Sequence, residues 1–386
     1  MKLACFSDVH AHNFSDFSKR LAVLWNRKTM RYDIVEPDDE NPDIKEMNSR
    51  LYNILKGLCD IRDHCIKQNI TEALFAGDLF HHRATIDVSV FNATYKVLQS
   101  YKTLGITTYA IAGNHDQVDN STVPVSALHS MEDIMHVIEQ PEVLELEDGT
   151  ELVALPYSKD KDFILSNMQK LRDQCKNPNE AIMMCHLGIN NAVVGSGMLT
   201  MTDEYTLKDL MYDKWKYVVV GHYHQPQLLE YNSFYCGTPV QNNFGDERVG
   251  EELYNGFFVI DTSKRYDVQF VPIIAPRFVT LSSAEDLENA DESLLKENYV
   301  RIKANADDAT QLQTKLDDML GDEHTEVRLE LEKDYQVDQR SAVSVTQSFA
   351  DAVRTYAKER WVNTENLDYG TKIGLDILSE AMNGGK

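Results

Sequence analysis

The sequence predicts an α/β fold, a sandwich or layered sheet, from the alternation of two patterns. Helical patterns lie between short apolar runs, and in the clearest of them apolar side chains between Leu51 and Cys65 fall on one face at the 3.6-residue period. Alternating strands and helices of this kind are typical of layered α/β domains. The apolar runs that indicate buried strands are Lys2–Phe6, Ala73–Ala76, Thr107–Ala112, Leu152–Leu155, Ala181–Cys185 and Tyr217–Val220.

Two further segments set the limits of this unit. The polar stretch Lys28–Lys45, with two prolines and a cluster of acids, interrupts the connection between the first strand and the first helix and predicts a surface loop. Gly256–Ile274 predicts two strands joined by a polar turn, and the composition changes at Pro276. We therefore expect a first domain over 1–270.

A smaller unit is expected after that boundary. Tyr299–Ala304 predicts a strand, a helix should run from about Asp307 to Leu320, and Glu326–Glu330 predicts another strand. Together they suggest a small α+β domain over 271–335. The segment 336–386 has apolar residues at helical spacing, including Val353, and predicts C-terminal helices that pack either on this protein's own core or on a partner.

Composition excludes several classes of protein. The 386 residues suggest about two domains, and the net charge of −24 argues against a protein that coats DNA through general attraction. A DNA enzyme is still allowed, because salt screens charges beyond about 8 Å and a local cationic cleft then matters more. The six cysteines are scattered and no apolar window is long enough to span a membrane, so we expect a reduced cytoplasmic protein, in the host cytoplasm if phage-encoded.

Polar clusters follow five of the predicted strands. In open α/β sheets the carboxyl ends of the strands form the crevice where sites assemble, so these clusters can converge although they span more than 200 residues. Each cluster alone has an ordinary explanation as a surface pair, a turn or a buried histidine. The five clusters are Asp8-Val9-His10, Gly77-Asp78, Gly113-Asn114-His115-Asp116, His186 and Gly221-His222-Tyr223-His224.

The residue types in these clusters suit a pair of divalent metal ions. Two Asp, one Asn and four His form a ligand set without thiolates, which favours Mn, Fe, Zn or Co over Ca. Alternate residues of D-x-H and H-x-H emerge on the same side and can reach one cavity. Two ions that share a ligand activate water for attack on phosphorus, which predicts ester hydrolysis.

All five clusters together resemble the signature of calcineurin-like metallophosphoesterases, which runs D-x-H, G-D, G-N-H-D/E, H and G-H-x-H in this order. The resemblance implies an αββα sandwich in which Asp78 bridges two ions. It also implies that His115 contacts the phosphate or protonates the leaving group, with Asp116 orienting it, although Asp116 could instead hold a turn or cap a helix. The resemblance assigns Asp8, His10 and His224 to one ion and Asn114, His186 and His222 to the other.

Within that family the chain is most similar to the SbcD-type nuclease subunit of bacterial, archaeal, eukaryotic and phage recombination complexes. Ala76–His81 resembles the G-D-L-F/V-F-D/H form of these nucleases, which implies that His81 lies beside the substrate; a solvated loop residue is the alternative. Tyr235–Glu247 resembles their Y-x-G-S-P segment and the N/F-G-E/D run after it, with Thr238 in place of Ser. The layout also matches, with 271–335 as a capping and DNA-recognition domain.

The resemblance implies a metal-dependent DNA nuclease, a double-strand exonuclease and single-strand endonuclease with two Mn(II) ions. Its partners would be DNA and an SbcC-like coiled-coil ATPase bound by 336–386, in DNA repair, recombination or replication, with homodimerisation through the early helices. Two alternatives stay open: a phosphomonoesterase or small-molecule phosphodiesterase of the same family, and a noncatalytic scaffold that keeps a metal site.

Overall fold

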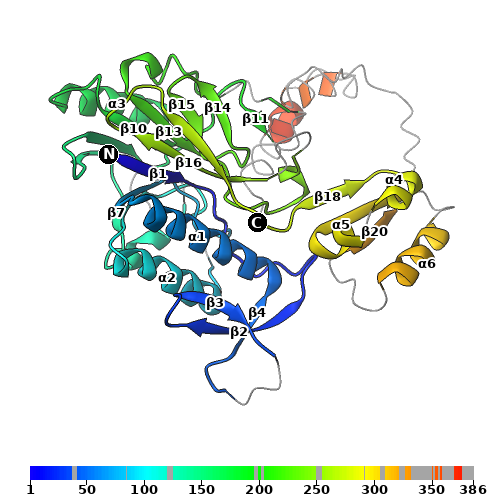
Figure 1. The fold of residues 1–386 in the computed structure, drawn as a ribbon. Helices are drawn as coiled ribbons and strands as arrows, with labels where there is room; N and C mark the ends of the chain where they lie inside the picture. Colours follow the sequence, from blue (N-terminus) through cyan, green and yellow to red (C-terminus); the bar gives the residue numbers. More distant parts are fainter. Residues whose placement is uncertain are drawn as a thin grey trace.

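The computed structural model describes most of the chain, and its main body is a sandwich of two six-stranded sheets with helices on the outer faces (Figure 1). The predicted αββα arrangement is confirmed. The described residues are 1–36, 41–83, 85–119, 125–194, 199–200, 204–248, 254–290, 292–304, 309–320, 327–331, 350, 353–354, 357–358 and 369–375.

The first sheet has the strand order β17-β16-β1-β5-β6-β7, and β1, β5, β6 and β7 run parallel. The second has the order β14-β15-β13-β10-β9-β8, with parallel β15, β13, β10 and β9 between two antiparallel edge strands. The strands are β1 (Lys2–Phe6), β5 (Glu72–Phe75), β6 (Thr107–Ile111), β7 (His136–Ile138), β16 (Gly256–Asp261) and β17 (Val268–Pro272), then β8 (Glu142–Glu145), β9 (Glu151–Leu155), β10 (Ile182–His186), β13 (Tyr217–Gly221), β14 (Gln227–Glu230) and β15 (Ser233–Tyr235).

Alternation along the strands builds three apolar layers. In β1, Leu3 and Cys5 pack between the two sheets, whereas Ala4 and Phe6 pack toward the helices α1 (Ser49–Gln68) and α2 (Val88–Thr103). Successive side chains of a strand point to opposite faces, so a strand between two layers must be apolar throughout. The helix α3 (Lys161–Gln174) covers the outer face of the second sheet in the same way.

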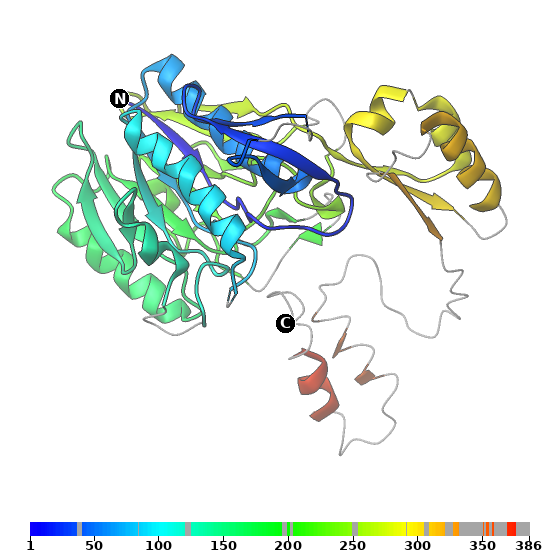
Figure 2. The same cartoon turned by 90° about the horizontal axis from the view of Figure 1, so that it is seen from below.

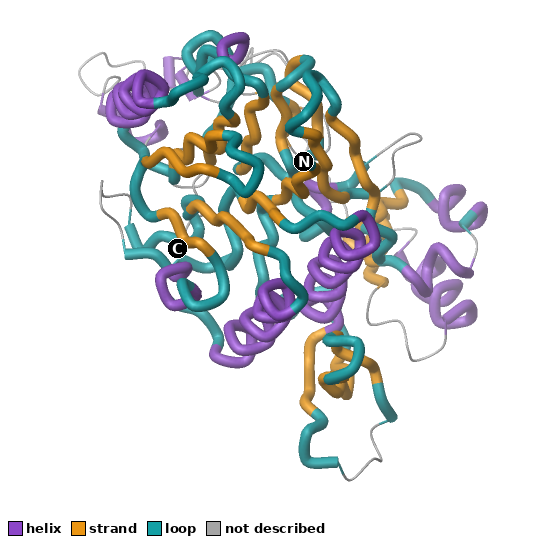
Figure 3. Tube along the Cα trace, turned by 60° about the vertical axis from the view of Figure 1, so that its left-hand side comes forward, coloured by secondary structure: helices purple, strands orange, loops and turns teal. Residues whose placement is uncertain are grey.

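The stretch Lys28–Lys45 is not simply a loop. It contributes β3 (Arg31–Ile34) and the first residue of β4 (Lys45–Asn48) to a three-stranded antiparallel sheet around β2 (Arg20–Asn26), below α1 and α2 in Figure 3. The cross-strand pair of Trp25 and Tyr32, with ring centroids 4.8 Å apart, stabilises this sheet. The surface-loop prediction was wrong here because the polar composition hides a hairpin.

A second three-stranded sheet lies to one side of the sandwich (Figures 1 and 2). Its parallel strands are β18 (Phe278–Leu281), β19 (Tyr299–Ala304) and β20 (Val327–Leu331), and its helices are α4 (Ala284–Asn289), α5 (Glu292–Glu297) and α6 (Ala309–Leu320). The predicted strand, helix and strand are confirmed as β19, α6 and β20, whereas β18, α4 and α5 were not expected. The Asn53 side chain on α1 donates to the Tyr299 hydroxyl at 2.6 Å, which joins this sheet to the sandwich.

The remaining elements are short. The structure has β11 (Val193–Val194) paired with β12 (Leu199–Thr200), and the 3-10 turns Ala127–Met131, Tyr212–Lys214 and Phe244–Asp246. Most of the predicted C-terminal helical segment 336–386 lies outside the described residues. Among the helices that are described, none is both long enough and apolar enough to cross a bilayer.

Candidate metal centre

The seven predicted metal ligands come together at one edge of the sandwich. They follow or end the parallel strands β1, β5, β6, β10 and β13, whose carboxyl ends meet at this edge. The contacts that join them are short and mostly buried. The ligands brought together are Asp8, His10, Asp78, Asn114, His186, His222 and His224.

One group of ligand atoms forms around His10. The His10 Nε2 lies 3.0 Å from the His224 Nε2 and 3.7 Å from the Asp78 Oδ2. Ligand atoms of Asp8, His10 and His224 all lie within 4.8 Å of one another. These three residues are the set that the family resemblance assigns to one ion.

A second group forms around His186. Its Nε2 lies 3.1 Å from the Asn114 Oδ1 and 3.3 Å from the His222 Nδ1. The Asp78 Oδ2 lies 3.3 Å from the His186 Nε2, so this one oxygen reaches both groups. That position is the one expected of a bridging carboxylate. Asp8 also comes within 4.8 Å of the Asp78 and His186 ligand atoms and so reaches the second group as well.

Hydrogen bonds from the far side of two imidazoles fix their ligand atoms. The His186 Nδ1 lies 2.7 Å from the Ala76 carbonyl oxygen, which can only accept, so Nδ1 carries a proton and donates. The His224 Nδ1 donates to the Asp246 carboxylate at 2.9 Å. When these rings are neutral, each Nε2 therefore carries a lone pair that points into the candidate metal site. This is the usual orientation of a metal-ligating histidine.

The donor set fits divalent cations. The Nε2 atoms of His10 and His224 lie 3.0 Å apart and, with Asp8, offer nitrogen and oxygen donors to one small space, a set that suits borderline divalent cations. The carboxylates of Asp8 and Asp78 are 0% and 1% exposed, and buried negative charge is costly unless it is paired. The buried His10 Nδ1 has no hydrogen-bond partner among the described residues.

The pKa shifts in this site reflect the close packing of carboxylates and imidazoles. Burial alone would lower the pKa of His186, but the Asp78 and Asp8 carboxylates outweigh burial and raise it to about 9. Burial is likewise outweighed at His224, where Asp246 raises the pKa to about 9. Although burial opposes it, the neighbouring histidines, His186 first, hold the pKa of Asp78 well below its usual range. The site therefore stabilises ionised carboxylates that lie beside positively charged groups.

Backbone strain is concentrated in the same loops. Asp8, His10, Asp78 and His222 have φ angles of 52°, 48°, 62° and 115°, in the left-handed region that non-glycine residues rarely occupy. Such residues cost about 1–3 kcal/mol each and persist only where the surroundings hold them. Here the Asp8 amide donates to the Gly77 carbonyl at 2.8 Å and the His10 amide to the Asp78 carbonyl at 3.1 Å.

Two glycines allow this close approach. A Cβ on Gly221 would lie 2.1 Å from the Ala76 carbonyl oxygen, and a Cβ on Gly113 would lie 2.1 Å from the Asp78 Oδ1. Neither neighbour is the free end of a flexible chain, because the first is backbone and the second is a candidate ligand. The glycines in these motifs thus make room for the centre.

Asp116 contacts the loops and not the imidazole of His115. Its buried carboxylate accepts hydrogen bonds from the amides of Asp78 at 2.7 Å, Leu79 at 2.8 Å and Gly113 at 3.0 Å. Burial, followed by the charge of Asp78, raises the pKa of Asp116 to about 7. The structure gives no contact for the expected orienting role and matches the alternative, in which Asp116 holds a turn.

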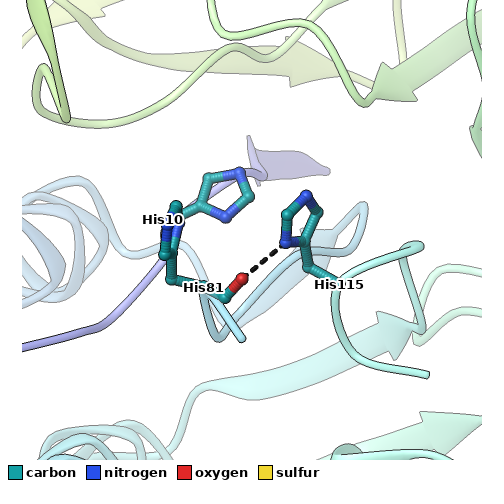
Figure 4. A group of neighbouring side chains, drawn as sticks. All are labelled: His10, His81 and His115. Carbon is teal, nitrogen blue, oxygen red and sulfur yellow. Dashed lines mark hydrogen bonds between the residues drawn. The ribbon is translucent and has the colours of Figure 1, made fainter. Parts of the chain in front are cut away.

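His115 and His81 lie beside the centre (Figure 4). The His115 Nδ1 donates to the His81 carbonyl oxygen at 2.6 Å, which leaves Nε2 as the ring atom available to a substrate. The His115 ring centroid lies 4.8 Å from that of His10, and the His81 centroid lies 5.6 Å from it. Burial, followed by the neighbouring His115, lowers the pKa of His81 to about 3, so the ring is neutral.

The sequence interpretation missed Asp246 as a site residue. Its carboxylate is 3% exposed, accepts from the His224 Nδ1 and also accepts from the Asn242 amide at 2.8 Å. The only signal in the sequence is the Asn243–Glu247 run, whose resemblance to the SbcD-type segment implies no role for Asp246. Its contact with His224 could not be read from spacing, because the two residues are 22 positions apart in sequence.

Comparison with known proteins identifies the family of this chain. A family model described as calcineurin-like phosphoesterase matches residues 1–226. Among solved structures, the chain is similar to a dimetal phosphatase from Danio rerio, with 9% sequence identity, a TM-score of 0.39, and coverage of 67% of this chain and 91% of that one. No curated protein matches the chain. Because the family model spans more than half of its length, the chain belongs to the calcineurin-like phosphoesterase family of dimetal hydrolases.

Proposed function

We propose that this protein is a metal-dependent DNA nuclease that hydrolyses phosphodiesters with two Mn(II) ions. The observation that carries the hydrolytic part is the position of Asp78, whose Oδ2 lies 3.7 Å from the His10 Nε2 and 3.3 Å from the His186 Nε2. A carboxylate oxygen shared by two ligand groups is the arrangement that a two-ion centre requires.

The chain's own residues have separable tasks in this reaction. Asp8, His10 and His224 would hold one ion, Asn114, His186 and His222 the other, and Asp78 both. When bound, such a pair of ions neutralises phosphate charge and activates water. His115 holds a proton on Nδ1 through the His81 carbonyl and offers Nε2 to the phosphate or to the leaving oxygen.

The choice of DNA as substrate is supported by the SbcD-type segments in the sequence. Ala76–His81 places the His81 ring near the centre, with its centroid 5.8 Å from that of His115. Asn243–Glu247 supplies Asp246, which accepts from the His224 Nδ1. Both segments that resemble the nucleases therefore contact the metal ligands or lie next to them, which favours a nuclease over other members of the family.

The proposal includes the partners that the resemblance implies. The protein would act in the cytoplasm on double-stranded ends as an exonuclease and on single strands as an endonuclease, in DNA repair, recombination or replication. An SbcC-like coiled-coil ATPase would bind the segment 336–386, and 271–335 would serve as the capping and DNA-recognition domain. Homodimerisation through the early helices belongs to the same proposal.

The test is cleavage of end-labelled linear DNA, single-stranded and double-stranded, alongside a chromogenic phosphodiester. We expect wild type to cleave the single strand and the small ester when Mn(II) is present and not when it is chelated, and Asp78→Ala to cleave neither. Lys170→Ala, an exposed substitution on α3, is the matched control. Cleavage of the small ester alone, also after the coiled-coil ATPase is added, would overturn the DNA proposal and favour a small-molecule phosphodiesterase.

A further inference from the structure

We propose that the groove between the three-stranded sheet β2-β3-β4 and the helix α2 binds a single strand of DNA leading to or from the metal centre. This inference rests on the proposed function, and it specifies that the DNA reaching the metal centre is single-stranded. The groove measures about 760 Å³, which is the size of a site for an organic ligand rather than a surface dimple. Residues from β2, β3, β4 and the first half of α2 line it.

The sheet side of the groove carries an aromatic wall. Trp25 on β2 lies opposite Tyr32 on β3, with the rings edge to face. Val23 pairs with Lys45 on β4, and directly paired residues point to the same face, as do residues two apart on one strand. Trp25, Tyr32 and Lys45 therefore share the face of the sheet that looks into the groove.

Cationic side chains surround this wall. Arg20, Arg27, Lys45 and Lys96 all line the groove and are exposed, in a chain whose net charge is −24. Within the part of the chain that is described, none of the four forms an ion pair with an acid, so their charge is available to phosphates. The Lys96 Nζ lies 5.3 Å from the centre of the Trp25 ring, which places a cation beside the aromatic surface.

Carboxylates also line the groove, and they do not cancel this character. Asp43, Glu46 and Asp87 are the acids among the lining residues, against four cations. The Asp87 carboxylate is engaged as the N-cap of α2, where it accepts from the Ser89 amide at 2.6 Å. The net charge of the residues that line the groove is therefore positive, in a protein whose overall charge is strongly negative.

The groove begins next to the metal centre. The His12 ring centroid lies 5.4 Å from that of His81 and 4.4 Å from that of His82, so His12 continues the row of rings away from the centre. The next residue, Asn13, lines the groove, and its Nδ2 donates to the Ser89 Oγ at 3.3 Å. A strand whose scissile phosphate lies at the centre can therefore pass over His12 and enter the groove.

The combination of stacking surface and cations selects a single strand. Proteins that bind single strands use a positively charged groove with aromatic side chains on which bases stack. In a duplex the base faces are already stacked inside the helix, so an aromatic wall finds only base edges and backbone. Trp25 and Tyr32 would add affinity for an unpaired base and little for a paired one.

Binding is measured with the full chain in EDTA, so that no cleavage occurs, as the fluorescence anisotropy of a labelled oligothymidylate at several salt concentrations. We expect Trp25→Leu to weaken binding by roughly tenfold, since it removes one stacking surface. Lys96→Glu should weaken binding and reduce the slope of log affinity against log salt by about 0.7, because one phosphate contact is lost. Lys170→Glu on α3 is the charge-matched control and should bind as wild type.

The outcomes separate this inference from the proposed function. Suppose that wild type binds and cleaves DNA but Trp25→Leu and Lys96→Glu bind it as tightly as wild type does. The groove inference would then be wrong, and the proposed nuclease function would be unaffected. If wild type hydrolyses the chromogenic ester but neither binds nor cleaves any DNA, the DNA proposal fails and the groove inference fails with it. Thermal unfolding of both variants shows whether weaker binding reflects a local change, as we expect, or a loss of fold, which would contradict the assignment.

Discussion

In the metal centre, the ligands from the first four motifs are buried, with His186 0% and Asn114 3% exposed, and each contacts another part of the site. In the groove, Arg20 and Lys45 lie on a small sheet inserted between β1 and α1, Lys96 lies on α2, and all three are exposed. The centre is rigid because buried polar groups must be satisfied. The groove side chains keep their hydration and their freedom.

This difference predicts the size of mutational effects. A change in the centre leaves a buried charge or a strained loop without its partner, which costs several kcal/mol. A change in the groove removes one contact among several, which costs about 1 kcal/mol or less for an exposed cation and about 1–3 kcal/mol for a stacking ring. The following substitutions test that contrast, beginning with the largest effect.

His115→Ala should lower the rate of phosphodiester hydrolysis by roughly 10²- to 10⁴-fold, because it removes the group that offers Nε2 to the substrate. Metal content, measured by elemental analysis of the purified protein, should stay at the wild-type value, since His115 is not among the seven ligands. A variant that lost its metal along with its activity would instead make His115 a ligand.

Asp246→Asn should lower metal affinity or activity by roughly 10- to 100-fold. The amide oxygen can still accept from the His224 Nδ1, but the negative charge that raises the pKa of His224 is gone. Titration of Mn(II) into the metal-free protein measures the change. An affinity equal to that of wild type would mean that Asp246 only packs beside the site.

Gly221→Ala should destabilise the fold by about 1–3 kcal/mol, because its Cβ would lie 2.1 Å from the Ala76 carbonyl oxygen. The same carbonyl accepts from the His186 Nδ1, so the centre should loosen as well. Denaturant unfolding gives the free energy, and Gly149→Ala is the comparison, since a Cβ there meets no atom within 4 Å although φ is +82°. Gly221 is not among the glycines with positive φ, so its loss would come from crowding, whereas a loss at Gly149→Ala would come from its φ; a Gly221→Ala variant as stable as wild type would contradict the crowding.

Lys45→Ala should have the smallest effect, a few-fold loss of affinity for a single strand of DNA, because one exposed cation contributes about 1 kcal/mol or less. The loss should shrink as salt is raised from low to physiological concentration. Anisotropy titrations at two salt concentrations measure it. A loss that exceeds that of Trp25→Leu would place the main contact on β4 instead of on the aromatic wall.

The same contrast explains what could be predicted from the sequence. The sandwich strands and the convergence of the seven candidate ligands were predictable because apolar runs and local spacings such as Asp8-Val9-His10 carry the information. The sheet β2-β3-β4 was missed because β3 and β4 are short and mostly polar, and only cross-strand pairs such as Trp25 and Tyr32 join them to the apolar β2. The roles of Asp116 and Asp246 depend on contacts between distant loops, which a spacing rule does not contain.

The central claim is a pair of ion sites joined by Asp78, and calorimetric titration of Mn(II) into the metal-free protein tests it most directly. Wild type should bind two ions per chain, and Asp78→Asn should bind at most one with comparable affinity, because the oxygen between the His10 and His186 groups loses its charge. A single ion in wild type, or two undiminished sites in Asp78→Asn, would contradict the account.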